Sequence, residues 1–282
     1  MNETNCKVLV CCHKKDIFAK EPPYFPIQVG KAISSVDLGI PGDDTGDNIS
    51  EKNPSYCELT GLYWAWKNLK NTDIIGLCHY RRYFDFHGQT RRGFPWTAYK
   101  TDRFGDLDLS IPQEILDAVQ KGAVVMAKPR TYRNTLFVEY CTSHISDDIR
   151  LLHNVIKVSQ PQNIQDAFFK IVYQGNKLRH FNMFIMRWDL FDQYCSWLFP
   201  LLGTMEGGID ISHYNTAQKR IFGYMAERLL NVWIEANGIP VIEKPVLWFN
   251  DAEDLLSMYS PLRYRLRLIT NQLAHFFSKP RQ

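Results

Sequence analysis

The chain has 282 residues, of which 45% are hydrophobic, so it can form one large α/β domain or two small ones. Its formal net charge of +3 is too small to indicate a nucleic-acid-binding protein. Its seven cysteines include no Cys-x-x-Cys pair, which excludes common zinc sites and is typical of a reduced, cytosolic protein. We expect no secretory leader and no membrane-spanning segment, because neither a basic leader nor a long apolar run occurs.

The first part of the chain alternates predicted strands with a predicted helix. Residues 7–12 form a short apolar run typical of a strand, and the proline-rich residues 18–30 are expected to form a loop. Residues 56–69 have apolar side chains at three- and four-residue spacings and are predicted to form a helix. Residues 74–78 are a second apolar run. This strand–helix–strand order predicts that the two strands are parallel.

Both predicted strands are followed by basic residues. Residues 13–15 are His, Lys and Lys, and residues 79–83 read HYRRY. Ligands of open α/β sheets collect at the carboxyl ends of strands, and arginine presents a planar fork of donors to phosphate oxygens. We therefore expect a clamp for a nucleotide diphosphate, although Arg81 and Arg82 could equally pair with surface carboxylates. No GxGxxG or Walker motif occurs, so the nucleotide is not held as in NAD-binding or P-loop proteins.

The acidic residues 42–50 (GDDTGDNIS) lie between the first strand and the first helix. Glycine with Asp, Asn and Ser is typical of turns, so the simplest interpretation is a capped turn. Three carboxylates so close together repel one another unless a positive group lies among them. Asp43, Asp44 or Asp47 could therefore face a ligand hydroxyl or a cation.

The rest of the chain continues the alternation of strands and helices. A long polar segment at residues 88–108 is typical of a lid. Residue Gly223 lies inside a predicted helix, where glycine costs about 1 kcal/mol, so we expect a packing or ligand reason for it. The predicted helices are 111–119, 138–156, 190–202 and 216–236, and the predicted strands are 123–127, 177–188, 239–242 and 246–248.

Five stretches together resemble a known bacterial family. They are GDDTGDNIS (42–50), ELTGLYWAWKN (58–68), IGLCHYRRYF (75–84), HFNMFIM (180–186) and FGYMAERLLNVW (222–233). They are similar to capsular and O-antigen polysaccharide glycosyltransferases that were long catalogued only as a domain of unknown function. The resemblance implies a single α/β domain of GT-A type over residues 1–258, with a mostly parallel central sheet flanked by helices.

The same resemblance implies the activity and the partners. Some members are similar to galactofuranosyltransferases that use UDP-galactofuranose, which implies inverting transfer of galactofuranose to a lipid-linked glycan. A non-catalytic carbohydrate-binding or assembly subunit with the same fold is the alternative. The residues expected to bind the nucleotide sugar are His13, Lys14, Asp44, Asp47, His79, Tyr80, Arg81, Arg82, Asn182 and Arg228.

The sequence departs from the usual metal-binding pattern of GT-A enzymes. GT-A enzymes usually carry an Asp-x-Asp sequence that holds a metal–diphosphate, whereas the corresponding residues 78–81 here read CHYR. Arginines can neutralise a leaving diphosphate without a cation. If Mn²⁺ or Mg²⁺ does bind, Asp43, Asp44 or Asp85 would supply its ligands.

An inverting transfer needs a carboxylate that accepts the proton of the acceptor hydroxyl. Glu227 is the first candidate, and it could instead be a buried ion-pair partner of Arg228 or Arg220. Asp210, which follows a Gly-Gly break, and Asp148 are the next candidates.

The last segment, residues 259–282, is predicted to be a separate basic helix. Its apolar residues recur every three to four positions and are accompanied by Arg263, Arg265 and Arg267. Such a helix can lie on a membrane surface with its arginines toward anionic headgroups, which would place the protein at the inner face of the plasma membrane. In the alternative, the apolar stripe packs on the catalytic domain.

Overall fold

The structure is a computed structural model that describes residues 4–251 and 261–278. Its strands form one nine-stranded sheet and one two-stranded sheet, the latter made of β7 and β8. The strands are β1 (Cys6–Cys12), β2 (Tyr24–Gln28), β3 (Ile74–His79), β4 (Arg82–Phe84), β5 (Trp96–Tyr99), β6 (Val124–Ala127), β7 (Arg130–Thr131), β8 (Lys177–Leu178), β9 (Phe184–Arg187), β10 (Val241–Lys244) and β11 (Val246–Phe249).

The large sheet has the order β10-β6-β9-β3-β4-β11-β5, with β1 paired to β3 and β2 paired to β1. Strands β1 and β3 are parallel, as predicted. The α/β class is confirmed, but the sheet is mixed rather than mostly parallel: β9 runs antiparallel to both β3 and β6. Strand β9 begins at the edge where β3 ends, because Phe184 pairs with Leu77. The residues before β9 therefore lie beside the carboxyl end of β3.

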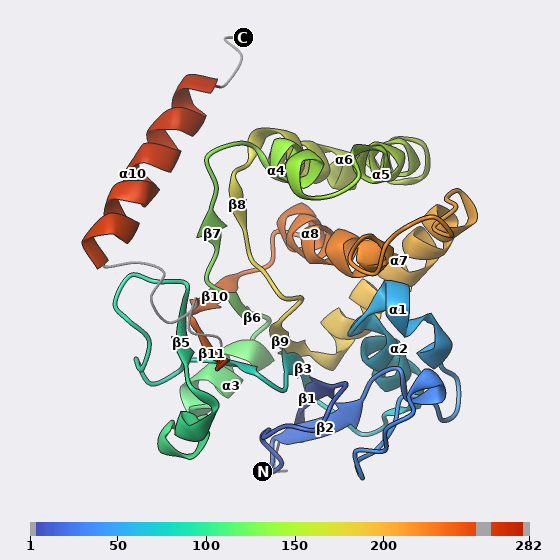
Figure 1. The fold of residues 1–282 in the computed structure, drawn as a ribbon, viewed down its shortest axis with the longest axis vertical. Coiled ribbons are helices and arrows are strands. Elements are labelled where there is room, and N and C mark those ends of the chain that lie inside the picture. Colours follow the sequence, from blue (N-terminus) through green and yellow to red (C-terminus); the bar gives the residue numbers. More distant parts are fainter. Residues whose placement is uncertain (1–3, 252–260, 279–282) are drawn as a thin grey trace.

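Helices cover both faces of this sheet (Figure 1). The larger core cluster lies between one face and helices α2, α4, α5, α6, α7 and α8, and the smaller cluster includes α3 on the other face. On β3, Ile75 and Leu77 point into the larger cluster, whereas Ile74 and Cys78 point into the smaller one. The helices are α1 (Asn53–Tyr56), α2 (Leu59–Asn68), α3 (Gln113–Gln120), α4 (Leu136–Ser143), α5 (Ser146–Ser159), α6 (Gln162–Phe168), α7 (Trp188–Gly207), α8 (Ile221–Ala236) and α10 (Pro261–Ser278).

Two of the predicted helices are each broken into two. The predicted helix 56–69 is interrupted at Cys57, whose φ of 54° is incompatible with a right-handed helix. The break places Glu58 immediately before α2. The predicted helix 138–156 is interrupted at His144 and Ile145, whose backbone is extended.

Two segments predicted to be loops contain strands. Within 18–30, β2 pairs in parallel with β1 and places Pro26 opposite Val10. Proline is tolerated there because β2 is an edge strand that pairs with β1 alone in the sheet. Within 88–108, β5 pairs with β11. The sequence pattern did not predict these strands, because residues 18–30 are rich in proline and residues 88–108 are mostly polar.

The predicted C-terminal helix is present as α10, at one edge of the molecule beside β7 (Figure 1). Asn271 Nδ2 donates a hydrogen bond of 3.1 Å to the carbonyl of Thr131, and the ring of Tyr264 stacks on Phe94 with centroids 4.3 Å apart. Among the described residues, no helix has both the length and the apolar character needed to cross a bilayer. The division of the chain at residues 258 and 259 stays a prediction.

Candidate functional site

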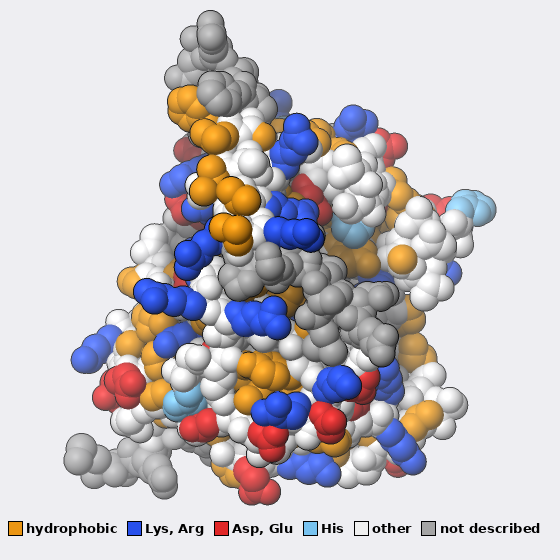
Figure 2. All heavy atoms as spheres, turned by 60° about the vertical axis from the view of Figure 1, so that its left-hand side comes forward, with side chains coloured by type: hydrophobic (Ala, Val, Ile, Leu, Met, Phe, Trp, Pro, Cys, Tyr) orange, Lys and Arg blue, Asp and Glu red, His pale blue; other side chains and the backbone are white. Residues whose placement is uncertain are grey.

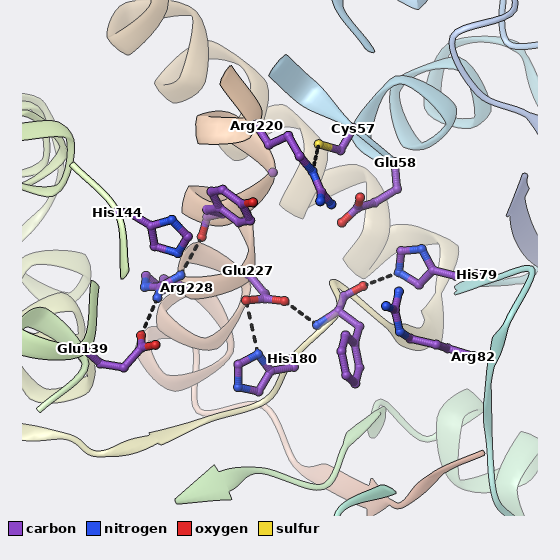
Figure 3. A pocket seen from close by; sticks show the side chains of 13 residues that line it. Cys57, Glu58, His79, Arg82, Glu139, His144, His180, Arg220, Glu227 and Arg228 are labelled. Carbon is purple, nitrogen blue, oxygen red and sulfur yellow. Dashed lines mark hydrogen bonds and ion pairs between the residues drawn. The ribbon is translucent and has the colours of Figure 1, made fainter. Parts of the chain in front are cut away.

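The carboxyl end of β3 opens into a cleft made of two adjoining cavities. We call the smaller one, of about 260 Å³, the inner cavity and the larger one, of about 720 Å³, the outer cavity. Both are lined by Cys57, Glu58, His79, Arg82 and Arg220. Figure 3 shows the inner cavity between α8, the start of α2 and the ends of the central strands.

A tight turn before β9 organises the inner cavity. Phe181 and Asn182 have φ values of 77° and 51°, which are uncommon for residues other than glycine. The turn directs the Phe181 carbonyl to His79 Nε2 at 2.7 Å. Since a carbonyl only accepts, Nε2 carries the proton, and burial lowers the pKa of His79 so that the ring is neutral at pH 7. Non-glycine residues held at positive φ cluster at functional sites.

Arg82 lines both cavities and is largely buried. Its guanidinium carbon lies 4.6 Å from the ring centre of Phe181 and 4.7 Å from that of Trp248. No carboxylate in the described part of the chain forms an ion pair with it, and its buried Nε has no hydrogen-bond partner. Burial lowers the pKa of Arg82, yet guanidinium remains charged in proteins. The two rings hold a rigid, charged donor group at the boundary of the two cavities.

The neighbouring Arg81 behaves differently. Its Nη2 and Nε both lie 2.7 Å from Asp16 Oδ2. Arg81 therefore fits the alternative in which the arginines pair with carboxylates, although it also lines the outer cavity. The two arginines look equivalent in the sequence, but among the described residues only Arg81 forms an ion pair with a carboxylate.

Further positive charge comes from residues just before α8. Lys219 and Arg220 lie in a 3₁₀ turn (Gln218–Arg220) and line the outer cavity. Arg220 Nε contacts Cys57 Sγ at 3.4 Å, and no ion pair joins Arg220 to a carboxylate among the residues that the structure describes. Glu58 is the single carboxylate among the described side chains of this cavity. The outer cavity therefore suits an anion. The sequence pattern did not indicate these two residues, because the turn lies inside the predicted helix 216–236.

Glu58 is the carboxylate common to both cavities. Its Oε1 accepts a hydrogen bond of 2.6 Å from Asn182 Nδ2, and Oε2 has no hydrogen-bond partner among the described residues. Figure 3 shows its carboxylate near the centre of the site, on the same side as Arg220 and His79. The sequence pattern did not indicate Glu58 as a site residue, because helical periodicity does not show that the helix breaks at Cys57.

Glu227 lines the inner cavity and is held by two partners. Its Oε1 accepts from the backbone N–H of Phe181 at 2.6 Å, and Oε2 lies 3.4 Å from His180 Nδ1. Burial raises the pKa of Glu227, but the charge and hydrogen bond of His180, the Arg228 charge and the Phe181 N–H outweigh it, and the pKa falls to about 2. A carboxylate with so low a pKa is a weak proton acceptor at pH 7.

Arg228, expected to bind the nucleotide sugar, already has a partner. Its Nη2 forms an ion pair of 2.9 Å with Glu139, and Nη1 donates to the Tyr224 carbonyl at 3.0 Å. The residue lines the inner cavity, but its charge is neutralised there. Five residues earlier, Gly223 has the packing reason expected of it, because a Cβ at this position would lie 3.1 Å from Cys57 Sγ.

The other expected nucleotide-binding residues divide into two groups. His13 and Tyr80 line the outer cavity with ring centroids 5.1 Å apart, and Lys14 Nζ lies 6.0 Å from the Tyr80 ring centre. Asp44 and Asp47 are exposed and line neither cavity, and Asp47 accepts a hydrogen bond of 3.1 Å from the Tyr63 hydroxyl. The first group therefore lies at or beside the outer cavity, and the second lies away from both cavities.

Two of the three carboxylates expected to hold a metal ion, those of Asp43 and Asp85, accept hydrogen bonds from nearby backbone N–H groups. The buried Asp43 carboxylate accepts from the N–H groups of Gly30 and Lys31 and from the Ser50 hydroxyl. The Asp85 carboxylate accepts three backbone N–H groups, from residues 87, 89 and 90, and so shapes its own loop. No group of three or more His, Cys, Asp or Glu side chains in the described ranges is arranged to hold a metal ion.

Asp210 and Asp148 lie outside the cleft. Asp210 is exposed and accepts from the N–H of Ser212 at 2.9 Å, so it shapes a local turn. Asp148 is buried on α5 and accepts from the Tyr214 hydroxyl at 2.6 Å. Neither lines either cavity, so the structure does not bring them together with Glu227.

A family model and a solved structure each match most of the chain. Residues 7–238 match a family described as a domain of unknown function, DUF4422. A solved structure described as a WbbM bifunctional glycosyltransferase in its apo form superposes with a TM-score of 0.76 and 29% sequence identity. The match covers 88% of this chain and 46% of that protein, so this chain spans about half its length. No curated protein matches significantly.

Proposed function

The chain belongs to the DUF4422 family, and from this premise we propose that it is a glycosyltransferase that uses a nucleotide-diphosphate sugar. The similarity to a bifunctional glycosyltransferase supports the reaction class. The observation that carries the proposal is the cleft at the end of β3, where Arg82 and Arg220 have no carboxylate partner among the described residues.

These two arginines would bind the diphosphate of the donor. Guanidinium groups bind phosphate oxygens through paired hydrogen bonds and stabilise charge on a leaving diphosphate. The rings of Phe181 and Trp248 fix Arg82 before the ligand arrives, which reduces the entropy lost on binding. Lys219 and His13 add donors on the outer side of the same cavity.

The acceptor proton would pass to Glu58. The acceptor hydroxyl oxygen forms the new bond to the anomeric carbon, the bond from that carbon to the diphosphate oxygen breaks, and the hydroxyl proton moves to the carboxylate. Glu58 is favoured over Glu227 because its Oε2 has no hydrogen-bond partner among the described residues, whereas both oxygens of Glu227 are engaged. Glu227 would instead be a positioning residue that holds the turn before β9.

The finer assignment follows from the sequence resemblance. We propose UDP-galactofuranose as the donor, inversion at the anomeric carbon, and a lipid-linked glycan of capsule or O-antigen as the acceptor. The acceptor class would place the reaction at the inner face of the plasma membrane.

The test is a transfer and hydrolysis assay with a panel of nucleotide sugars that differ in base and sugar. Release of nucleoside diphosphate from UDP-galactofuranose, above that from UDP-galactopyranose and UDP-glucose, supports the reaction class and the proposed donor. Turnover of a different donor would keep the reaction class and reject the sugar. Binding of nucleoside diphosphate without turnover of any donor, with lipid-linked saccharides present as acceptors, would point to a non-catalytic subunit.

A further inference from the structure

Helix α10 carries an apolar stripe that faces away from the rest of the structure. Its side chains are each more than half exposed, from 53% for Leu273 to 71% for Phe276. Figure 2 shows them as a continuous hydrophobic strip along the helix. The members of this stripe are Leu262, Leu266, Ile269, Leu273 and Phe276. An exposed apolar strip of this length marks an interaction surface rather than ordinary surface variation.

The opposite side of α10 is the side that packs. At about 100° per residue, Tyr264 and Asn271 lie roughly 180° from the centre of the stripe. Both are 9% exposed, and they make the stacking contact with Phe94 and the hydrogen bond to Thr131. The structure therefore does not follow the alternative in which the apolar stripe packs on the catalytic domain. The polar and aromatic face attaches the helix and leaves the apolar face outward.

Positive charge borders the stripe. Arg263 and Arg265 are exposed and lie on its two sides, at roughly 100° and 60° from its centre. Under the helix, Arg130, Arg133 and Arg267 line a cavity of about 410 Å³. Helix α10 contains no Asp or Glu. An apolar stripe bordered by arginines is complementary to a bilayer that has acyl chains below anionic headgroups.

We propose that α10 docks the protein on an anionic lipid bilayer. The helix lies parallel to the surface, the stripe enters the boundary between headgroups and acyl chains, and Arg263 and Arg265 contact lipid phosphates. From Leu262 to Phe276 the stripe is about 21 Å long at 1.5 Å per residue, enough to contact several lipids. The cavity under α10 shares Glu139 with the inner cavity, so the docking helix and the cleft are joined through adjoining cavities.

The inference does not depend on the donor or on catalysis, so it is tested without either. Binding of the full chain to vesicles of phosphatidylcholine is compared with binding to vesicles that also contain phosphatidylglycerol, at low and at physiological salt. We expect binding to the anionic vesicles that weakens as salt increases. The L266Q/L273Q variant removes apolar area without adding charge and should bind at least about tenfold more weakly. The R263Q/R265Q variant should lose about fivefold per charge on anionic vesicles only.

A matched control removes two exposed apolar residues elsewhere. Ile33 and Val158 are 53% and 87% exposed, and the I33Q/V158Q variant should bind vesicles like the parent chain. Near-ultraviolet circular dichroism verifies that each variant is folded. Failure of the folded parent chain to bind anionic vesicles at low salt, or equal binding by the L266Q/L273Q variant, would overturn the proposal. It would also be overturned if the parent chain were a dimer that L266Q/L273Q converts to a monomer while neither binds vesicles, because the stripe would then be a self-association surface.

Discussion

Asn182 donates a hydrogen bond of 2.6 Å to Glu58, and this contact joins the turn before β9 to the start of α2. The buried amide of Asn182 also donates to the carbonyl of Gly223 at 3.1 Å, so its orientation is fixed by two elements. Glu58 Oε1 is thereby held in place, while Oε2 is left for a reacting proton. The contact therefore brings the turn before β9 and the start of α2 together in one candidate catalytic site.

The first prediction concerns this carboxylate. Glu58→Gln keeps the size of the side chain but removes its basicity, so kcat should fall at least about a hundredfold with little change in the affinity for UDP. Steady-state kinetics with the active donor measures kcat, and calorimetry measures UDP binding. The exposed Glu51, seven residues earlier, supplies the control, and Glu51→Gln should retain full activity. Full activity of Glu58→Gln, with loss in Glu227→Gln, would return the role of base to Glu227.

A second prediction follows from the low pKa of Glu227. Because its pKa falls to about 2 in the folded protein from 4.5, ionised Glu227 stabilises the fold above about pH 4.5. This contribution, about 3 kcal/mol, is lost as the pH falls toward 2. Urea unfolding of the parent chain and of Glu227→Gln between pH 7 and pH 3 measures it. The difference in unfolding free energy should shrink below about pH 4.5, and a difference independent of pH would contradict this account.

The ion pair between Glu139 and Arg228 gives a third prediction. The Arg228 side chain is 3% exposed, so Glu139→Ala leaves a buried charge without its partner and should cost about 3–5 kcal/mol of unfolding free energy. The exposed pair Arg150–Asp147 is the control, and Asp147→Ala should cost less than about 1 kcal/mol. Should Glu139→Ala instead keep its stability and change UDP affinity, Arg228 would belong to the nucleotide site after all.

The fourth prediction concerns metal ions. Since arginines can take the place of a cation at the diphosphate, treatment with EDTA should change UDP affinity by less than about twofold and leave turnover in place. Calorimetry and the transfer assay, each with and without EDTA, measure these effects. Complete loss of activity that Mn²⁺ restores would show that a metal ion takes part.

The sequence predicted those parts of the fold and the site that depend on the local pattern of residues. Apolar runs predicted β1, β3 and β6, and the basic residues after β3 predicted an anion-binding edge, because both signals depend on neighbouring residues. The break at Cys57 was not predictable from periodicity, which shows neither the positive φ of this residue nor its close approach to Gly223 of α8. The sequence therefore indicated where the cleft lies but not that Glu58 lies in it.

The difference between Arg81 and Arg82 depends on contacts that no local pattern contains. The partner of Arg81 is Asp16, 65 positions earlier, and the rings around Arg82 come from Phe181 and Trp248. Residues 42–50 are one of the five stretches that carry the family resemblance, yet the buried carboxylate of Asp43 holds backbone N–H groups there. A distinctive sequence can thus reflect a structural role.

The most direct measurement of the central claim is the affinity for UDP of three arginine variants, determined by calorimetry. Arg82→Ala and Arg220→Ala should each weaken binding about ten- to a hundredfold, the equivalent of one lost charge-assisted hydrogen bond of about 1.5–3 kcal/mol. Arg187 is at the other end of β9 and is paired with Asp189, so Arg187→Ala should bind UDP like the parent chain. Equal UDP affinity in all three variants and the parent chain, or no UDP binding by the folded parent chain, would contradict the account.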